Sequence, residues 1–278
     1  MKKSIVALIL IVSLAAFMAL KVKVDKISRA KIPGSSIIYL PSGKYLKYGT
    51  FGYSSLLADL IYLWAIQYYS NYSIKDRFQY LDHIFSVIAE LDPHYLDPYE
   101  IGAIIAVYEA RDLNLAFKIL DRGLQKNPDQ WIFPFEAGHY AQMTVKDYHL
   151  AQIYYKKAME IPGAPPITKR LYANAAFNVG DYQTAWNSWK EVYQTAPDER
   201  IKKIASAHLY RIKSTLDIKT LKKAIARYKL KFGTRPQTLS ELVRAGLLAS
   251  LPRDLDGKNY LYNPQTGEVE APSNPWKR

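Results

Sequence analysis

The sequence predicts an all-α fold in which helical hairpins stack into a solenoid, preceded by a transmembrane helix and followed by a small helix and β-hairpin. Four prolines that each close a helix-like stretch recur along the chain, at Pro93, Pro128, Pro162 and Pro197. Their spacings are 35, 34 and 35 residues. Three alanines recur in phase with them, at Ala116, Ala151 and Ala185. A period of about 34 residues is typical of a helix-turn-helix repeat, a fold that usually binds other molecules rather than catalysing a reaction.

The unit before Pro197 shows why these residues recur. We expect its first helix over 167–179, ending at Gly180, because glycine adopts the left-handed cap conformation without steric cost. Asp181 suits the N-cap of the second helix. That helix has an apolar stripe at spacings of four and three, formed by Ala185, Trp189 and Val192. The small residue lets two helix backbones approach closely, and Pro197 ends the helix.

These paired small and aromatic positions, together with Ala137 and Gly138, resemble the tetratricopeptide repeat (TPR) family. The resemblance covers about residues 62–199, within a solenoid that we assign to 53–199. The first unit departs from the pattern because Leu81 stands where its successors have alanine. A Sel1-like repeat and a plain helical bundle are the alternatives, and the Sel1-like repeat usually has a longer period.

The TPR resemblance implies that the first helix of each pair lines a concave groove for a protein partner. Ten residues are expected on the groove-facing side, at Ile101, Ile105, Tyr108, Phe135, His139, Gln142, Arg170, Asn174, Phe177 and Asn178. Arg170 and Asn174 lie one helical turn apart and resemble half of the carboxylate clamp of some TPR domains. The later elements of that clamp are missing. An extended or helical peptide is therefore the favoured occupant of the groove.

The N-terminus predicts a membrane anchor over residues 1–22. Two lysines precede seventeen uncharged residues from Ser4 to Leu20, a length at the short end for a membrane-spanning helix. No small-x-small cleavage site follows, which favours an uncleaved signal anchor over a cleaved signal peptide. Residues 23–52 are then a basic, membrane-proximal linker.

The orientation of this anchor is contested by two observations. A Met-Lys-Lys start before an apolar core is the usual layout of an export signal. Residues 21–47 nevertheless carry seven basic side chains and one acidic one, and the positive-inside tendency disfavours their translocation. We favour a single-pass protein of the bacterial inner membrane with most of the chain in the periplasm.

The net charge of +13 is unevenly distributed. Residues 48–199 carry twelve basic and eighteen acidic side chains, whereas residues 200–235 carry twelve basic and one acidic. We assign 200–235 to basic capping helices, whose solvated face is one interpretation because repeat arrays need polar ends. Binding of anionic lipid is a second, and binding of nucleic acid, without a recognised module, is the least favoured. The lysines expected to form an anionic-surface site are Lys222, Lys223 and Lys229.

The C-terminal segment, residues 236–278, predicts a short helix that begins at Thr238 or Ser240 and a hairpin with strands near 260–262 and 268–270. Residues 221–270 resemble the C-terminal part of type II secretion pseudopilins. Asp254 and Asp256 stand where those proteins hold calcium, but the surrounding residues depart from their pattern. A plain polar turn is therefore favoured over a metal site.

Nothing in the sequence points to catalysis. There are no cysteines, and the five histidines have no metal-ligand spacing. We therefore expect no enzyme, no catalytic or metal-binding residues and no cofactor. The expected function is a membrane-anchored scaffold that binds a protein partner in an envelope complex related to a pilus or secretion machine. An adaptor for anionic lipid or nucleic acid, working through 200–235, is the alternative.

Overall fold

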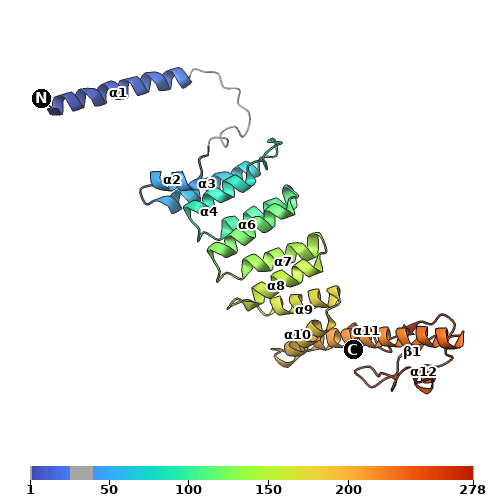
Figure 1. The fold of residues 1–278 in the computed structure, drawn as a ribbon. Helices are drawn as coiled ribbons and strands as arrows, with labels where there is room; N and C mark the ends of the chain where they lie inside the picture. The colour runs from blue at the N-terminus through green and yellow to red at the C-terminus, as the bar shows by residue number, and fades with distance from the viewer. Residues whose placement is uncertain (1, 26–39, 278) are drawn as a thin grey trace.

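The computed structural model describes residues 2–25 and 40–277, and these are mostly helical, as the all-α prediction requires (Figure 1). The first helices are α1 (Lys2–Asp25), α2 (Gly43–Gly49), α3 (Ser54–Tyr69) and α4 (Leu81–Leu91). The middle helices are α5 (Asp97–Ile104), which continues into the π-helix η2 (Ile105–Glu109), α6 (Leu113–Lys126), α7 (Ile132–Thr144), α8 (Tyr148–Glu160), α9 (Ile167–Val179) and α10 (Tyr182–Gln194). The last elements are α11 (Glu199–Phe232), α12 (Ser240–Arg244), β1 (Leu261–Tyr262), β2 (Val269–Glu270) and the 3-10 helix η3 (Pro275–Lys277).

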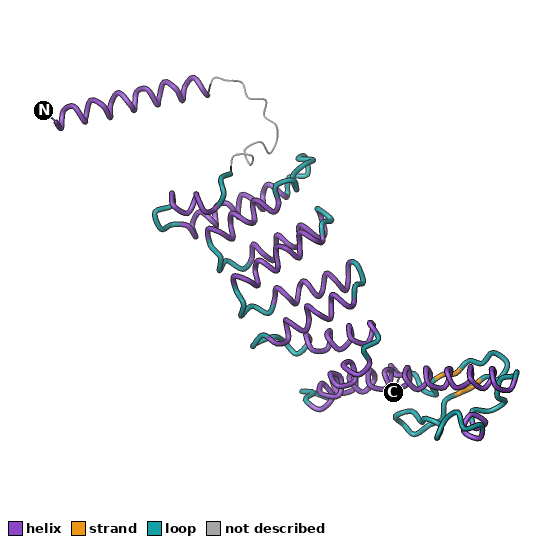
Figure 2. Tube along the Cα trace, viewed as in Figure 1, coloured by secondary structure: helices purple, strands orange, loops and turns teal. Residues whose placement is uncertain are grey.

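Consecutive helices from α3 to α11 pack against one another in chain order. The pairs α3–α4, α5–α6, α7–α8 and α9–α10 each form a hairpin, and each later hairpin packs on the one before it. Figure 2 shows these hairpins side by side in one stack, with α2 and α3 at one end and the C-terminal unit at the other. The sequence neighbours are therefore also the neighbours in space.

The residues that recur in the sequence form the interior of this stack. Ala116, Ala151 and Ala185 are completely buried. One helical turn after each alanine lies a large residue that is almost completely buried as well, namely Leu120, Tyr155 and Trp189. Small and large residues therefore alternate at the same depth of the three units that follow the first. This arrangement explains why the period is visible in the sequence.

Equivalent aspartates begin the second helix of three hairpins. The carboxylates of Asp112, Asp147 and Asp181 accept hydrogen bonds from backbone N–H groups three residues later, at 2.9, 2.9 and 3.2 Å. Each therefore satisfies an amide that the helix leaves unpaired. The predicted cap at Asp181 is confirmed, and so is Gly180, which has φ +86°. The bounds predicted for the preceding helix match those of α9.

Two predicted helix boundaries are wrong. The Tyr- and Trp-rich sequence of 48–73 predicts the first helix pair, but this stretch has only the end of α2 and one long helix, α3, whose partner is α4. The capping helices expected over 200–235 are one continuous 34-residue helix, α11. No glycine or proline interrupts residues 199–232, so nothing in this segment ends the helix before Gly233.

The C-terminal unit packs on the second half of α11. Its strands pair antiparallel, Leu261 with Glu270 and Tyr262 with Val269, which confirms the hairpin. Buried Asp254 holds the preceding turn: its carboxylate accepts hydrogen bonds from the N–H of Lys258 at 2.7 Å and from the hydroxyl of Tyr210 at 2.9 Å. The aspartate thus has the structural role of a polar turn.

Helix α1 includes residues 2–22 of the predicted anchor. No helix within the described residues combines the length and the apolar character that crossing a membrane requires. The side chains before Ile9 and residues 26–39 of the predicted linker lie outside the described residues. The anchor stays a prediction.

Candidate partner-binding surface

The first helices of the hairpins, α5 with η2, α7 and α9, carry the ten residues predicted to line a groove. On α5 and η2 the predicted face is rotated by about one residue. Ile101 is half-buried against the core and Ile105 is only 6% exposed, so the predicted role of Ile105 as a surface contact is wrong. Its apolar side chain is drawn into the interior between hairpins. The exposed side has Ile104 and Tyr108, at 40% and 60% exposure.

The three residues predicted on α7 are all half-buried. Phe135 packs between the rings of Trp131 and Tyr155, at centroid distances of 5.7 and 6.1 Å. His139 lies beside Tyr140, and the Oε1 atom of Gln142 is buried with no hydrogen-bond partner among the described residues. The exposed side of the helix continues to Met143, at 60% exposure.

On α9 the predicted residues lie near the start of α11. The guanidinium of Arg211 stacks over the ring of Phe177, with 4.2 Å from Cζ to the centroid. The amide of Asn178 donates to the backbone carbonyl of Asn174 at 2.8 Å, which places those side chains on one side of the helix. Arg170 lines a hollow of about 750 Å³ between the ends of α8, α9, α10 and the start of α11.

Acidic side chains and tyrosines connect the exposed sides of α5 and α7. Burial, and then the nearby charge of Glu136, raises the pKa of the Glu100 carboxyl above its usual value. Burial also raises the pKa of Tyr140, whose hydroxyl lies beside Glu136. The ring of Tyr108 meets that of Tyr140 edge to face, at 6.0 Å. Two helices thus share one acidic, aromatic patch.

Toward the first hairpin, this patch extends to Tyr62 on α3. Tyr62 meets Tyr95 edge to face at 5.2 Å. Burial, followed by the charges of Tyr95 and Asp97, raises the pKa of Tyr62 to about 12. We call the residues of this surface the acidic row: Tyr62, Tyr95, Asp97, Glu100, Tyr108 and Glu136, with the buried ring of Tyr140 beneath it. Sequence reasoning missed Glu100 and Glu136, although Glu100, Ile104 and Tyr108 follow one another at the four-residue spacing of a helix face.

The three predicted lysines lie on the C-terminal half of α11. Lys222 and Lys223 line a hollow of about 560 Å³ with Ile218 and Ala226, and Lys229 is exposed further along the helix. The one acidic residue of this segment, Asp217, does not neutralise them. Its carboxylate accepts from the Tyr260 hydroxyl at 2.8 Å and from Lys213 at 2.5 Å.

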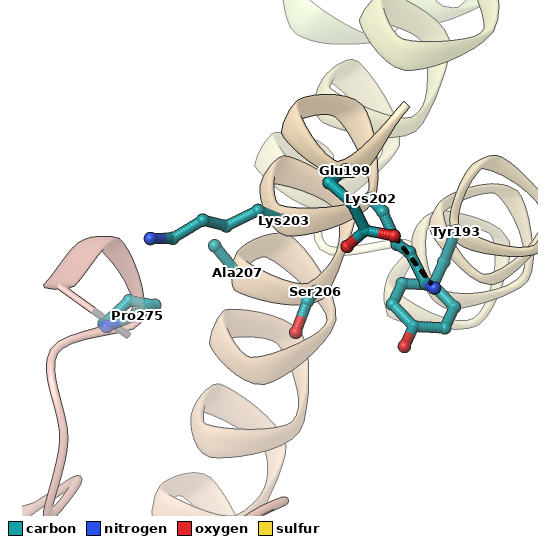
Figure 3. Close-up of a pocket in the computed structure, with 7 residues that line it drawn as sticks. All are labelled: Tyr193, Glu199, Lys202, Lys203, Ser206, Ala207 and Pro275. Carbon is teal, nitrogen blue, oxygen red and sulfur yellow. Dashed lines mark hydrogen bonds and ion pairs between the residues drawn. The ribbon is translucent and has the colours of Figure 1, made fainter. Parts of the chain in front are cut away.

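A third hollow, of about 540 Å³, lies where α10, α11 and η3 meet (Figure 3). Figure 3 shows Glu199 paired with Lys202 next to the ring of Tyr193, while Lys203 extends toward Pro275. The Glu199–Lys202 distance is 3.4 Å, and the pair is exposed enough to be worth little. The hollow has no nucleophile paired with a base, so its chemistry is that of a structural junction.

Compared with known proteins, the sequence matches no family model and no curated protein. Within the described residues, no group of three or more histidine, aspartate or glutamate side chains is arranged to hold a metal ion. The surfaces available for function are therefore the acidic row, the hollow beside Arg170 and the basic side of α11.

Proposed function

We propose that this chain is a membrane-anchored, TPR-like scaffold whose stacked hairpins form a solenoid that binds a protein partner. The 34-residue period supports the TPR-like assignment, because its small and large positions are the buried contacts between hairpins. The uncharged run from Ser4 to Leu20 supports the single-pass anchor, with the bulk of the chain in the periplasm. The pseudopilin-like C-terminal segment supports an envelope complex related to a pilus or secretion machine.

The acidic row is the observation that carries this proposal. Its carboxylates lie on neighbouring first helices rather than on one loop, so a segment of a partner can contact several hairpins at once. Tyrosines beside carboxylates suit a segment with lysine or arginine, because aromatic faces and carboxylates both attract cations. At the α9 end the charge changes sign at Arg170 and Arg211. The row therefore favours a partner segment with basic residues toward α5 and acidic residues toward α9.

Co-purification from native membranes tests this function. Tyr108→Ala combined with Glu136→Lys should release the partner, because it removes an exposed ring and reverses a charge in the acidic row. Leu261→Ala is a matched control, since Leu261 is 56% exposed and Tyr108 is 60% exposed. Partner retention in the double variant, with the protein still folded, would contradict the proposal.

Anionic binding by the basic side of α11 is the second candidate, favoured by the hollow that Lys222 and Lys223 line. Three hairpins separate α3 from α11, so at 8–10 Å between packed layers the two ends lie roughly 30 Å apart. Charges are screened within about 8 Å at physiological salt. The basic side of α11 is therefore electrostatically independent of the α3 end, and a partner bound there is anionic. Charge reversal of Lys222, Lys223 and Lys229 should release such a partner and leave a partner on the acidic row bound.

A further inference from the structure

Helices α2 and α3 expose an unusually apolar surface at one end of the stack. Four aromatic side chains on α2 and the following loop are 71–91% exposed, namely Tyr45, Tyr48, Phe51 and Tyr53. Three leucines of α3 are 56–59% exposed, namely Leu56, Leu60 and Leu63. We call these seven residues the terminal face. Exposed apolar side chains gathered at one end of a stack mark a contact with a membrane or another protein.

The leucines form one stripe on the outside of α3. Their spacings of four and three place them on a single side of the helix. The buried side, at Ala58, Ile61 and Ala65, is the opposite one and packs toward α4. Figure 1 shows α3 and α2 at the end of the stack, so no further hairpin among the described residues covers the outer side of α3. Terminal units of repeat arrays usually have a polar outer face, and this one does not.

The aromatic residues surround an exposed turn between α2 and α3. Phe51 is 91% exposed and has φ +49°, a conformation that a bulky residue seldom adopts. It is followed by Gly52 at φ +98°. The side chain of Phe51 is hardly buried against the described residues, so burial among them does not stabilise this strained turn. The turn instead presents its aromatic side chain to the surroundings.

The charges and the chain connection around the terminal face indicate which surface covers it. Lys44 and Lys47 lie on α2 with the exposed tyrosines, and the one acidic residue of α2 and α3, Asp59, borders the leucine stripe. Fourteen residues join α1 to Leu40 and reach at most about 50 Å. An anchor in α1 therefore keeps the terminal face near the bilayer. Tyrosine at the headgroup level, leucine below it and lysine beside anionic lipid are the residues that a bilayer surface attracts.

We propose that the terminal face docks on the surface of an anionic bilayer and holds the stack upright on the membrane. This inference rests on the proposed N-terminal anchor and adds a second, non-covalent contact with the same membrane. It gives the acidic row a fixed orientation relative to the bilayer, with the basic side of α11 pointing away from it.

Single-cysteine labelling of the full chain tests the docking, and the absence of native cysteines makes each label unique. Phe51→Cys and Leu60→Cys carry an environment-sensitive fluorophore in protein reconstituted into phosphatidylcholine–phosphatidylglycerol vesicles. Leu261→Cys is the matched control, because Leu261 and Leu60 are both 56% exposed. Leu230→Cys, on the basic part of α11, reports whether that helix meets lipid instead.

The expected result is quenching by nitroxide-headgroup lipids at positions 51 and 60 and an aqueous signal at 261 and 230. Protein that fails to float with the vesicles, or that keeps aqueous labels at 51 and 60, overturns the proposal. Labels that are protected but not quenched by lipid also overturn it, because another protein segment or a second copy then covers the face. The vesicles contain no partner, so the quenching does not depend on the partner-binding proposal, whose failure the co-purification experiment detects separately.

The lysines provide an independent arm of the same experiment. Lys44→Gln with Lys47→Gln should lower the ratio of docked to free label by roughly 30-fold in anionic vesicles, since each lysine contributes about 1 kcal/mol beside such a surface. The ratio in pure phosphatidylcholine should not change. Equal ratios for the variant and the original chain in anionic vesicles would contradict the role of charge in docking.

Discussion

His208 provides a pH-dependent test of how the C-terminal end is assembled. Its imidazole stacks on the indole of Trp189, with 3.8 Å between centroids and 6° between planes. Trp276 meets its edge at 4.9 Å. Helices α10 and α11 and the C-terminal segment therefore meet at this side chain. Burial, and then the charge of Arg211, lowers its pKa to about 4 from the usual 6.5.

The sign of the stability effect follows from this lowered pKa. The unfolded chain binds a proton below pH 6.5, whereas the folded chain resists it until about pH 4. Stability is therefore complete above pH 6.5 and falls as the pH decreases from 6.5 toward 4. At pH 5 the unfolded imidazole is almost fully protonated and the folded one is not, which costs about 2 kcal/mol.

The measurement is urea unfolding in mild detergent at pH 7.5 and pH 5, for the original chain and for His208→Phe. The variant retains an aromatic ring but does not titrate, so the difference between the two pH dependences isolates His208 from the carboxylates. We expect the original chain to lose about 2 kcal/mol more than the variant. An imidazole pKa at or above 6.5, measured by NMR titration, would refute the reasoning.

Three further predictions test the packing. Gly138→Ala should destabilise the fold by about 1–3 kcal/mol in thermal unfolding, because the new Cβ would lie 2.8 Å from the ring of Tyr155. Gly49→Ala is the control: its Cβ would meet no atom within 4 Å, so stability should change by less than about 0.5 kcal/mol. Asp254→Ala should remove about 3 kcal/mol of protection in hydrogen exchange over 251–272, since it leaves buried donors without an acceptor, and unchanged exchange there would argue against its role. Asp82→Ala breaks the ion pairs of Asp82 with Lys118 and Arg122 of α6. It should lower the free energy of unfolding by only about 1 kcal/mol, because the Asp82 side chain is 36% exposed.

The hairpin stack was predictable because its determinants are local and repeated. Ala116 and its equivalents are visible as a period since three successive units place a small residue at the same helix crossing. Gly180 and Asp181 mark the end of one helix and the start of the next through their own backbone preferences. The hairpin between β1 and β2 was predicted from its turn residues for the same reason.

The candidate surface was predicted less well, because the rotation of a helix depends on what packs against it. Ile101 and Ile105 were placed on the groove side, but both are apolar and the neighbouring hairpins bury them to different degrees. The acidic row arises where helices from different units meet, which no local pattern reports. The contact of His208 with Trp276 joins residues 68 positions apart, so the sequence carries no signal for it.

Site-specific photo-crosslinking in native membranes tests the scaffold proposal most directly. A photoreactive residue replaces Tyr108, Met143 or Leu261, which have similar exposures of 60%, 60% and 56%. The account predicts that one protein species crosslinks from positions 108 and 143 and not from 261. Absence of any product at 108 and 143, or the same products at all three positions, would contradict partner binding along the first helices.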